Sequence, residues 1–248
     1  MLYTELLAIA VFLITYALIM DERIHRAVAA MAGAAVIIFT QIVPWEKIPE
    51  YLDLGTIFLL MGMMIIVNTT RKSGLFEYIA IKTAKLAHGS PIRVLILFSI
   101  VTAVVSAFLD NVTTVLLLTP MLLYIAKLMK LNPVPFLLSE IFASNVGGAA
   151  TLIGDPPNIM IASASGLTFN DFLMVMGPIV LVDMVIMLVM LYLIYRKGLH
   201  VRPEEQQKIV RTIDALDERA AILDRSLFNK SVVTILLVVF LFFIHSSL

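Results

Sequence analysis

The sequence predicts an all-α polytopic membrane protein. Of its 248 residues, 60% are hydrophobic and 15% are charged, whereas soluble domains have about 45–50% apolar and about 25% charged residues. The mean hydropathy is +0.99, and several apolar stretches approach the roughly 20 residues that a helix needs to cross a bilayer. The formal net charge is zero, which gives no indication of a nucleic-acid partner. The absence of cysteine excludes disulfides, thiolate metal sites and cysteine nucleophiles.

The first three predicted spans cover residues 2–20, 27–43 and 54–68. Segment 2–20 carries Glu5 and lacks both a basic beginning and a small-residue cleavage site. It is therefore interpreted as a retained helix and not as a signal peptide. Segment 74–88 is only semi-apolar and has lysines beside apolar positions at helical spacing, which predicts a helix lying along the membrane surface.

Residues 92–128 are predicted to form a re-entrant hairpin. Its apolar part, residues 94–126, is 33 residues long and is interrupted by the polar sequence DNVTT, Asp110–Thr114. Two full crossings with a turn would need about 40 residues or more. A hairpin that enters and leaves on one side, with its polar tip inside the membrane, fits this length better. Two short tilted spans are the alternative.

Residues 136–164 are predicted to form a broken helix. The segment is apolar enough to insert but contains Gly147-Gly148, Gly154 and Pro156-Pro157, which free backbone groups from helical pairing. Irregular backbone at membrane depth is tolerated only where protein or a water-filled cavity surrounds it. A long span follows at residues 171–195, then a charged connector at 196–230, and another span begins at 231.

The distribution of basic residues tests this topology, because loops on the cytoplasmic side are enriched in lysine and arginine. With the N-terminus outside, seventeen of the eighteen Lys and Arg residues lie inside and only Lys47 lies outside. The connector 196–230, with eight basic and six acidic residues, is then cytoplasmic. We interpret it as a solvated link between two halves.

Four acidic residues fall within apolar segments: Asp110, Glu140, Asp155 and Asp183. An ionisable group near the centre of a membrane helix costs about 2.5–3.5 kcal/mol on insertion scales. No Lys or Arg lies in the same segments. Each carboxyl must therefore be protonated, hydrated, hydrogen-bonded or neutralised by a mobile cation, and the last case is what a cation-coupled transporter needs.

The hairpin tip offers a first cluster of oxygen ligands. Asp110, Asn111, Thr113 and Thr114 lie at adjacent and i+3/i+4 positions beside a turn. Ca²⁺ and Mg²⁺ are hard cations that bind oxygen ligands. We expect the same preference of Na⁺, which is also a hard cation. The structural alternative is that Asp110 caps the second arm through the amide of Thr113.

The broken helix holds the second cluster. Ser144 and Asn145 are predicted to end one half-helix, and Asp155 to be the N-cap of the next. Half-helix ends at the membrane midplane bind ions and substrates in secondary transporters, whereas the structural alternative is a kink with a capping aspartate. The candidate binding residues of this cluster are Ser144, Asn145, Gly147, Gly148, Thr151, Asp155 and Asn158.

Two further carboxyls are candidates for a proton relay. Glu140 lies four residues before Ser144, and therefore on the same helical face. The alternative to a proton relay is that its side chain extends toward the cytoplasmic side. Asp183 lies near the middle of the span 171–195, where a structural hydrogen bond to a neighbouring helix is the alternative.

Two motifs, SAFLDNVTTVLLLTP (Ser106–Pro120) and SNVGGAATLIGDPPNIMI (Ser144–Ile161), resemble signatures of the ion transporter superfamily. Within it the chain resembles arsenite and sodium/proton antiporter permeases, including those similar to the pink-eyed-dilution protein. Segments 21–34 and 62–87 also resemble that subgroup, so the resemblance covers nearly the whole chain.

The resemblance implies the first half of an inverted-repeat, elevator-type transporter with a re-entrant hairpin and a broken helix, which is often a homodimer. It also implies a transient Na⁺ site at Asn111, Thr113, Ser144, Asn145 and Gly147, with Gly148 beside it. Sodium/anion symporters of the superfamily have Ser-Asn-Thr at the hairpin tip. Here Asp110 replaces the serine, which disfavours simple sodium/dicarboxylate symport.

Members of the subgroup are usually much longer and have two repeats. Residues 1–195 correspond to the N-terminal repeat, and 231–248 to the first span of a second repeat that is missing from this chain. The chain is therefore expected to be an N-terminal fragment, with a half-transporter completed by another chain as the alternative.

The function expected from these observations is proton-coupled secondary transport of Na⁺ or an arsenite-type oxyanion. Asp110 and Asp155 would titrate against cation binding, with Na⁺ or H⁺ as the coupling ion and no other cofactor. The expected partners are a small inorganic or organic ion and membrane lipid, and the expected location is the plasma (inner) membrane. The alternatives are a sodium-coupled citrate-like carrier, an uncoupled channel-like subunit and a non-functional fragment. The sequence contains no Ser-His or HExxH arrangement that would indicate a hydrolytic enzyme.

Overall fold

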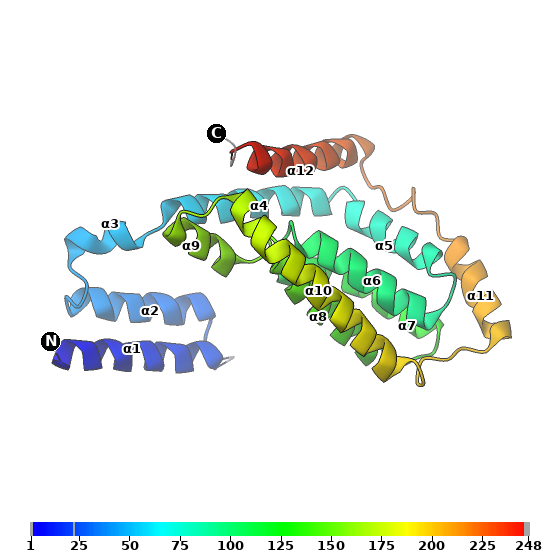
Figure 1. Ribbon diagram of the computed structural model, residues 1–248, viewed down its shortest axis with the longest axis horizontal. Coiled ribbons are helices and arrows are strands. Elements are labelled where there is room, and N and C mark those ends of the chain that lie inside the picture. The colour runs from blue at the N-terminus through cyan, green and yellow to red at the C-terminus, as the bar shows by residue number, and fades with distance from the viewer. Residues whose placement is uncertain (1, 22, 246–248) are drawn as a thin grey trace. The chain divides into compact units, whose positions relative to one another are not determined.

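The structure, a computed structural model, describes residues 2–21 and 23–245. These residues form helices and no strand, as the sequence predicts. The chain divides into two compact units, Met1–Leu54 and Gly55–Leu248, and each is described by itself (Figure 1).

The first unit is a helical hairpin followed by two short turns of helix. Helices α1 (Leu2–Met20) and α2 (Arg26–Phe39) pack against each other. They touch closely at Gly33, where a Cβ would lie 2.8 Å from Cγ2 of Thr15. The 3₁₀ helix η1 and the short α3 complete the unit, at Trp45–Lys47 and Ile48–Tyr51.

Helix α2 is shorter than the predicted span 27–43. Its 14 residues rise about 21 Å, less than the roughly 30 Å of a hydrocarbon core. The helix ends where Gln41 adopts a positive φ of 53° and the amide of Ile42 donates to the carbonyl of Ile37 at 3.1 Å, as at other helix C-termini with a left-handed residue.

The second unit contains nine helices among the residues described. They are α4 (Leu54–Arg71), α5 (Leu75–Leu86), α6 (Pro91–Ser106), α7 (Asn111–Leu128), α8 (Val134–Gly148), α9 (Pro156–Ser165), α10 (Phe169–Tyr195), α11 (Pro203–Asp214) and α12 (Arg225–His245).

Helix α8 is the centre of this unit. It packs against α6, α7 and α10, and α5 covers α6 and α7 (Figure 1). The fully buried side chains of this core include Phe98, Leu118 and Phe136. At Gly147 the backbones of α6 and α8 touch, since a Cβ there would overlap the carbonyl of Ala103. Helix α8 therefore packs against both arms of the predicted hairpin.

The predicted hairpin is formed by α6 and α7. Its arms have 16 and 18 residues, or about 24 and 27 Å of helix. Helix α7 is one of five described helices that are long and apolar enough to cross a membrane, over Tyr3–Met20, Leu54–Arg71, Asn111–Leu128, Phe169–Tyr195 and Arg225–Ile244.

The break between α8 and α9 lies at residues 149–155. Helix α8 runs beyond Ser144 and Asn145, where the sequence predicted its end, because Ala149 N still donates to Asn145 O at 3.1 Å. Asp155 is the N-cap residue of α9 and Pro156 its first helical residue. The next span, α10, begins with a capping box between Thr168 and Asp171.

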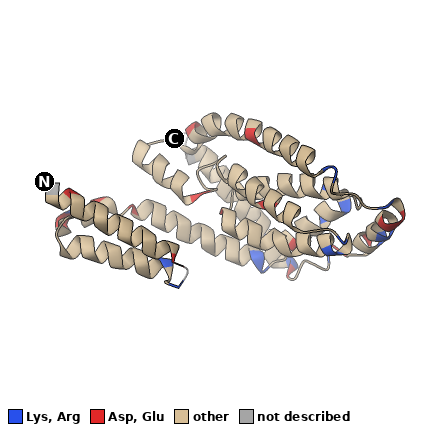
Figure 2. Cartoon of the chain, turned by 90° about the horizontal axis from the view of Figure 1, so that it is seen from below, with Lys and Arg blue, Asp and Glu red and all other residues tan. Residues whose placement is uncertain are grey.

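Many charged residues lie near helix ends or in connecting segments, but Glu140 and Asp183 lie near the middle of α8 and α10. Figure 2 shows largely uncharged helices, with Lys and Arg at helix ends and in connecting segments. In the second unit one end is held together by contacts of the connector: Lys85 pairs with Glu218, Gln206 bonds to the carbonyl of His88, and Leu223 to that of Ser73.

The connector is more than a solvated link. Its helix α11 packs on α5, with Ile209 and Ile213 buried in the main core. Helix α12 begins at Arg225, six residues before the predicted start of that span, because Asp224 Oδ1 accepts from the amides of Ser226 and Leu227 at 2.8 and 3.0 Å.

Candidate functional site

A cavity of about 390 Å³ lies within the second unit, at the tip of the α6–α7 hairpin. We call it the tip cavity. It is enclosed by α4, by the hairpin tip, by α8 and by the segment that leads into α9. The residues lining it are Leu60, Met63, Met64, Val67, Leu109, Asp110, Asn111, Val112, Asn145, Ile153, Asp155, Pro156 and Ile159.

Asn111 is the centre of the polar side of the tip cavity. Its Nδ2 donates to Oδ1 of Asn145 and to Oδ2 of Asp155, both at 3.3 Å. Its Oδ1 lies 2.6 Å from the hydroxyl of Ser106, which also lies 2.8 Å from the carbonyl of Ser144. This amide therefore joins the hairpin tip to both half-helices.

The ends of three helices meet at the cavity. Asp110 is the N-cap of α7 and accepts a hydrogen bond from the amide of Thr113 at 2.9 Å, as the structural alternative predicted. The same residue also lines the cavity. Asp155 occupies the N-cap position of α9, but its side chain makes no capping bond and faces Asn111. The C-terminal end of α8 brings a partial negative charge, and the two N-termini bring partial positive charges.

The cavity is acidic. Asp110 and Asp155 are the ionisable side chains among the described residues that line it, and none of those residues is basic. The carboxylates stand beside two primary amides, so the polar side offers several oxygen ligands. The lining residues that α4 contributes are all apolar: Leu60, Met63, Met64 and Val67. Such an arrangement can hold a desolvated cation against one polar face.

The unwound segment 149–155 is held by Asn158 and Thr151. Asn158 Nδ2 donates to the carbonyls of Gly148 at 3.1 Å and of Thr151 at 3.0 Å. The buried hydroxyl of Thr151 donates to the carbonyl of Ala107 in the hairpin tip and accepts from the amide of Ile153. Both residues therefore act behind the cavity, and neither lines it.

The structure separates the predicted site residues into two groups. It brings Asp110, Asn111, Asn145 and Asp155 together at the tip cavity. The remaining predicted residues do not line it: Thr113, Thr114, Glu140, Ser144, Gly147, Gly148, Thr151, Asn158 and Asp183. Of these, Gly148 lies directly behind Asn111.

Two of the residues predicted to bind Na⁺ contribute to packing or to a backbone bond. Gly147 allows α6 and α8 to touch, and the hydroxyl of Ser144 donates to the carbonyl of Ile141. Thr114 is fully buried, and its hydroxyl has no hydrogen-bond partner among the residues described. Asp183 is exposed on α10. Of the set predicted to bind Na⁺, Asn111 and Asn145 line the tip cavity, whereas Thr113, Ser144 and Gly147 do not.

Sequence reasoning missed the α4 wall and two hydroxyls. Ser106, which holds Asn111, stands at the start of the first motif, five residues before the asparagine, so its position was a usable signal. Thr119 bonds to Glu140 at 2.8 Å from 21 residues away, and no local pattern connects them. The wall formed by Leu60, Met63, Met64 and Val67 is recognisable in the sequence only as part of a span.

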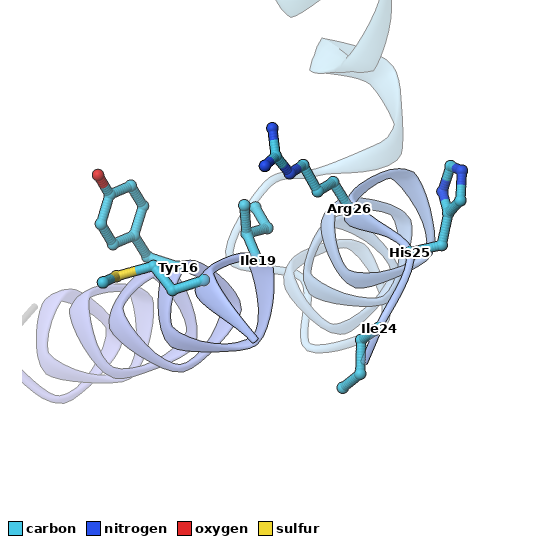
Figure 3. Close-up of a pocket in the computed structure, with 6 residues that line it drawn as sticks. Tyr16, Ile19, Ile24, His25 and Arg26 are labelled. Atoms are coloured by element: carbon cyan, nitrogen blue, oxygen red, sulfur yellow. The ribbon is translucent and has the colours of Figure 1, made fainter. Parts of the chain in front are cut away.

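A larger cavity, of about 550 Å³, lies at the turn of the α1–α2 hairpin. It is lined by Tyr16, Ile19, Met20, Ile24, His25 and Arg26, and no described lining residue is acidic. In Figure 3 the polar side chains of Tyr16 and His25 lie on opposite sides of the view, with Arg26 between them. Because its polar groups do not converge, this cavity is a weaker candidate than the tip cavity.

Comparison with known proteins identifies relatives over nearly the whole length of the chain. The profile of the citrate transporter family matches residues 16–248. The chain is 47% identical to the 46 kDa membrane protein of Mycobacterium leprae, over 98% of this chain and 57% of that protein. It is 45% identical to an uncharacterized transporter of Mycobacterium tuberculosis over the same shares. It is 39% identical to the P protein of Homo sapiens, over 67% of this chain and 21% of that protein.

The chain thus spans 57% of the length of these mycobacterial relatives. The match to P protein covers 176 residues. What a complete relative transports is consequently a property of more sequence than these 248 residues.

Proposed function

The chain belongs to the citrate transporter family, and from this premise we propose that it is the cation-binding part of a secondary active transporter that exchanges Na⁺ for protons. The proposal concerns the tip cavity. Its ligands would come from Asn111, Asn145 and Asp155, with Asp110 at the rim.

One observation carries the proposal: two carboxylates and two amides share a cavity that has no basic residue among its described lining. Isolated carboxylates at membrane depth are costly. A cation that enters the cavity offsets that cost, and oxygen atoms are the ligands that hard cations prefer. Protons and Na⁺ then compete for the same carboxylates, which is the basis of exchange.

The geometry suggests how Na⁺ would be held. Asn111 Nδ2 bonds to the oxygens of Asn145 and Asp155 at 3.3 Å, at the long end of the hydrogen-bond range. A cation between these two oxygens would replace weak contacts with stronger ones. Asp155 thereby takes the ligand role that the sequence motifs suggested for Thr113 and Ser144.

The charge of the cavity also bears on the transported solute. Two carboxylates favour Na⁺ and repel anions. An arsenite-type oxyanion that carries charge would enter only after a cation had bound. Sodium/proton exchange is therefore the form of the predicted antiport that the cavity supports best.

A second candidate is sodium-coupled transport of citrate or a similar carboxylate, which the family's description favours. The acidic cavity makes Na⁺ binding a precondition, because a tricarboxylate would otherwise meet Asp110 and Asp155. In this mechanism the amide of Asn111 would donate to the substrate once Na⁺ had displaced its present contacts.

The distribution of basic residues supports one orientation in the membrane. Many Lys and Arg of the second unit lie near helix ends or in connecting segments (Figure 2), and the connector bonds to the end formed by residues 73–88. We propose that this end faces the cytoplasm of an inner membrane, with the N-terminus outside, as the positive-inside rule requires.

The test is Na⁺ binding and ion flux by the purified chain. In detergent, NaCl is expected to raise the melting temperature relative to choline chloride. In proteoliposomes with an acid interior, Na⁺ is expected to dissipate the proton gradient, whereas the second candidate instead predicts Na⁺-dependent uptake of citrate without Na⁺-driven proton flux. Asp155→Asn should abolish these responses, and Asp214→Asn, at the exposed end of α11, should retain them. Correctly inserted wild-type chain that neither binds Na⁺ nor moves protons would refute the proposal.

A further inference from the structure

The most deeply buried ionisable side chain described is outside the tip cavity. Glu140, on α8, is 0% exposed. Its Oε2 accepts a hydrogen bond from the hydroxyl of Thr119 on α7 at 2.8 Å. Its Oε1 has no hydrogen-bond partner among the residues described. The described residues form two ion pairs, Lys85–Glu218 and Lys130–Glu205. Neither pair involves Glu140.

The elements packed against α8 are α6, α7 and α10. Among the residues described, the side chain of Glu140 bonds to Thr119. It bonds to none of the ionisable groups that α6, α7 and α10 carry. These groups are Arg93, Asp110, Tyr124, Lys127, Asp171, Asp183, Tyr192 and Tyr195. Glu140 therefore lies among uncharged neighbours such as Phe136 and Ala143 of its own helix, both fully buried.

Such surroundings select the protonated carboxyl. A charged carboxylate with one hydrogen bond and no ion pair loses most of its hydration on burial without compensation. A neutral carboxyl with one unpaired oxygen costs far less. Glu140 thus holds a proton in this conformation, and it can release the proton only if its surroundings become hydrated or gain positive charge.

The same two helices carry Glu140 and the tip cavity. Asn111 and Thr119 are eight residues apart on α7, and Asn145 and Glu140 are five residues apart on α8. The contacts Asn111–Asn145 and Thr119–Glu140 therefore join α7 to α8 at two levels, about 7–12 Å apart along the helices. A shift of α7 against α8 at the cavity must also change the setting of Glu140.

Helix α7 has a weak point at the level of Glu140. Pro120 stands inside the helix, directly after Thr119, and its ring removes the backbone donor that would pair with the carbonyl of Leu116. A helix can bend at such a position. The partner of Glu140 thus sits where α7 yields most easily, which gives the two contacts a way to change together.

We propose that Glu140 is the proton-carrying carboxyl that couples proton release to cation binding in the tip cavity. It is protonated while Asn111 bridges Asn145 and Asp155. It releases the proton when a cation replaces that bridge and α7 moves against α8. The inference rests on the proposed function, and it adds a proton site outside the cavity to the carboxylates within it.

The experiment measures protons released on Na⁺ binding. The purified full chain in weakly buffered detergent solution receives NaCl, with choline chloride as the reference, and a pH indicator records the release. Wild type is expected to release about one proton per bound Na⁺ more than Glu140→Gln. Gln keeps the size of the side chain and the acceptor for Thr119, so the variant should fold and still bind Na⁺. Glu77→Gln, at an exposed position of α5, should behave as wild type.

Infrared difference spectra give a second readout, the C=O stretch of a protonated carboxylic acid. In wild type this band should be lost when Na⁺ is added. In Glu140→Gln the band should be absent. Thr119→Val should weaken coupling without removing this band. Equal proton release from wild type and Glu140→Gln would overturn the inference while Na⁺ binding persisted. Failure of the proposed function looks different, because wild type itself would then show no response to Na⁺.

Discussion

Gly148 leaves the space that Asn111 occupies. A Cβ at Gly148 would overlap Oδ1 of Asn111 and lie 2.9 Å from its Cγ. The asparagine amide is held on its other sides by Ser106, Asn145 and Asp155. It therefore cannot move away from a new side chain without breaking these bonds. The glycine pair of the broken helix thus has two separate functions, since Gly147 serves the packing of α6 and Gly148 the position of Asn111.

Substitution of Gly148 by alanine should damage the tip cavity. The added methyl group forces the amide of Asn111 out of its place, so Na⁺ should no longer stabilise the protein. The free energy of unfolding should also fall by about 1–3 kcal/mol, the usual cost of overpacking. Thermal unfolding with and without NaCl measures both effects.

The matched control is Gly62→Ala in α4, where nothing lies within 4 Å of a Cβ. Alanine is the better helix former by about 0.5–1 kcal/mol, so this variant should be as stable as wild type or more stable and should keep its response to Na⁺. Equal effects of the two substitutions would contradict the role given to Gly148.

Removing one charge from the cavity should weaken cation binding without unfolding the protein. In Asp110→Asn the new amide still offers an oxygen to cap α7, because Asn and Asp are comparable N-caps. The affinity for Na⁺ should fall by roughly tenfold or more, which corresponds to about 1.4 kcal/mol. Calorimetric titration with NaCl measures this change. An unaltered affinity would show that Asp110 is only a cap.

Asn158 should matter for stability more than for binding chemistry. Its side chain donates to the carbonyls of Gly148 and Thr151, so Asn158→Ala leaves two carbonyls of the unwound segment without that donor. We expect a loss of about 1–3 kcal/mol in the free energy of unfolding, measured by thermal or denaturant unfolding. Asn229→Ala, at an exposed position of α12, removes an amide of the same size and should cost little. Similar losses in both variants would contradict this role of Asn158.

One contact between the connector and α5, the pair Lys85–Glu218, should be lost in acid. The hydrogen bond from Lys85 is the main reason that the pKa of Glu218 lies below its usual value of 4.5. A carboxyl with a lowered pKa stabilises the folded state above its unfolded pKa, and the stabilisation disappears as the pH falls through the lowered value. The contact should therefore persist at about pH 7 and be lost in acid, below the usual carboxyl pKa. Both side chains are partly exposed, so the effect should be local.

Hydrogen exchange of residues 203–214 measures the effect of losing this contact. Exchange corrected for its intrinsic pH dependence should be faster in acid than at neutral pH. Glu218→Gln should show the faster exchange already at neutral pH, and a variant that responds to acid as wild type does would exclude Glu218 as the cause. The buried Ile209 and Ile213 should still keep the helix near α5.

Much of the helical architecture was predictable from local sequence. Apolar length placed the helices near residues 2–20 and 171–195, and glycine and proline placed the break between α8 and α9. Two boundaries differed from the prediction: α2 ends early at the left-handed residue Gln41, and α12 starts early because Asp224 caps it. The resemblance to relatives of the pink-eyed-dilution protein in the ion transporter superfamily is confirmed by the match to P protein.

The candidate site was predictable only in part. Oxygen-bearing side chains at a turn and a break identified Asp110, Asn111, Asn145 and Asp155 as candidates, since polar groups in an apolar segment need a partner. Which of their neighbours shared the site could not be inferred from spacing. Thr113 and Ser144 were plausible by position, but their side chains do not line the tip cavity.

The sequence by itself determined that the chain is a bundle of membrane helices with two polar interruptions, because hydrophobic length and backbone-breaking residues act locally. Only the tertiary structure decided that Asn111 bridges Asn145 and Asp155, that α4 closes the cavity, and that Thr119 meets Glu140. Those contacts join residues 21 to 44 positions apart, and their geometry depends on how α6, α7 and α8 pack. Local preferences cannot specify such packing, because it is set by close approaches such as Gly147 on Ala103.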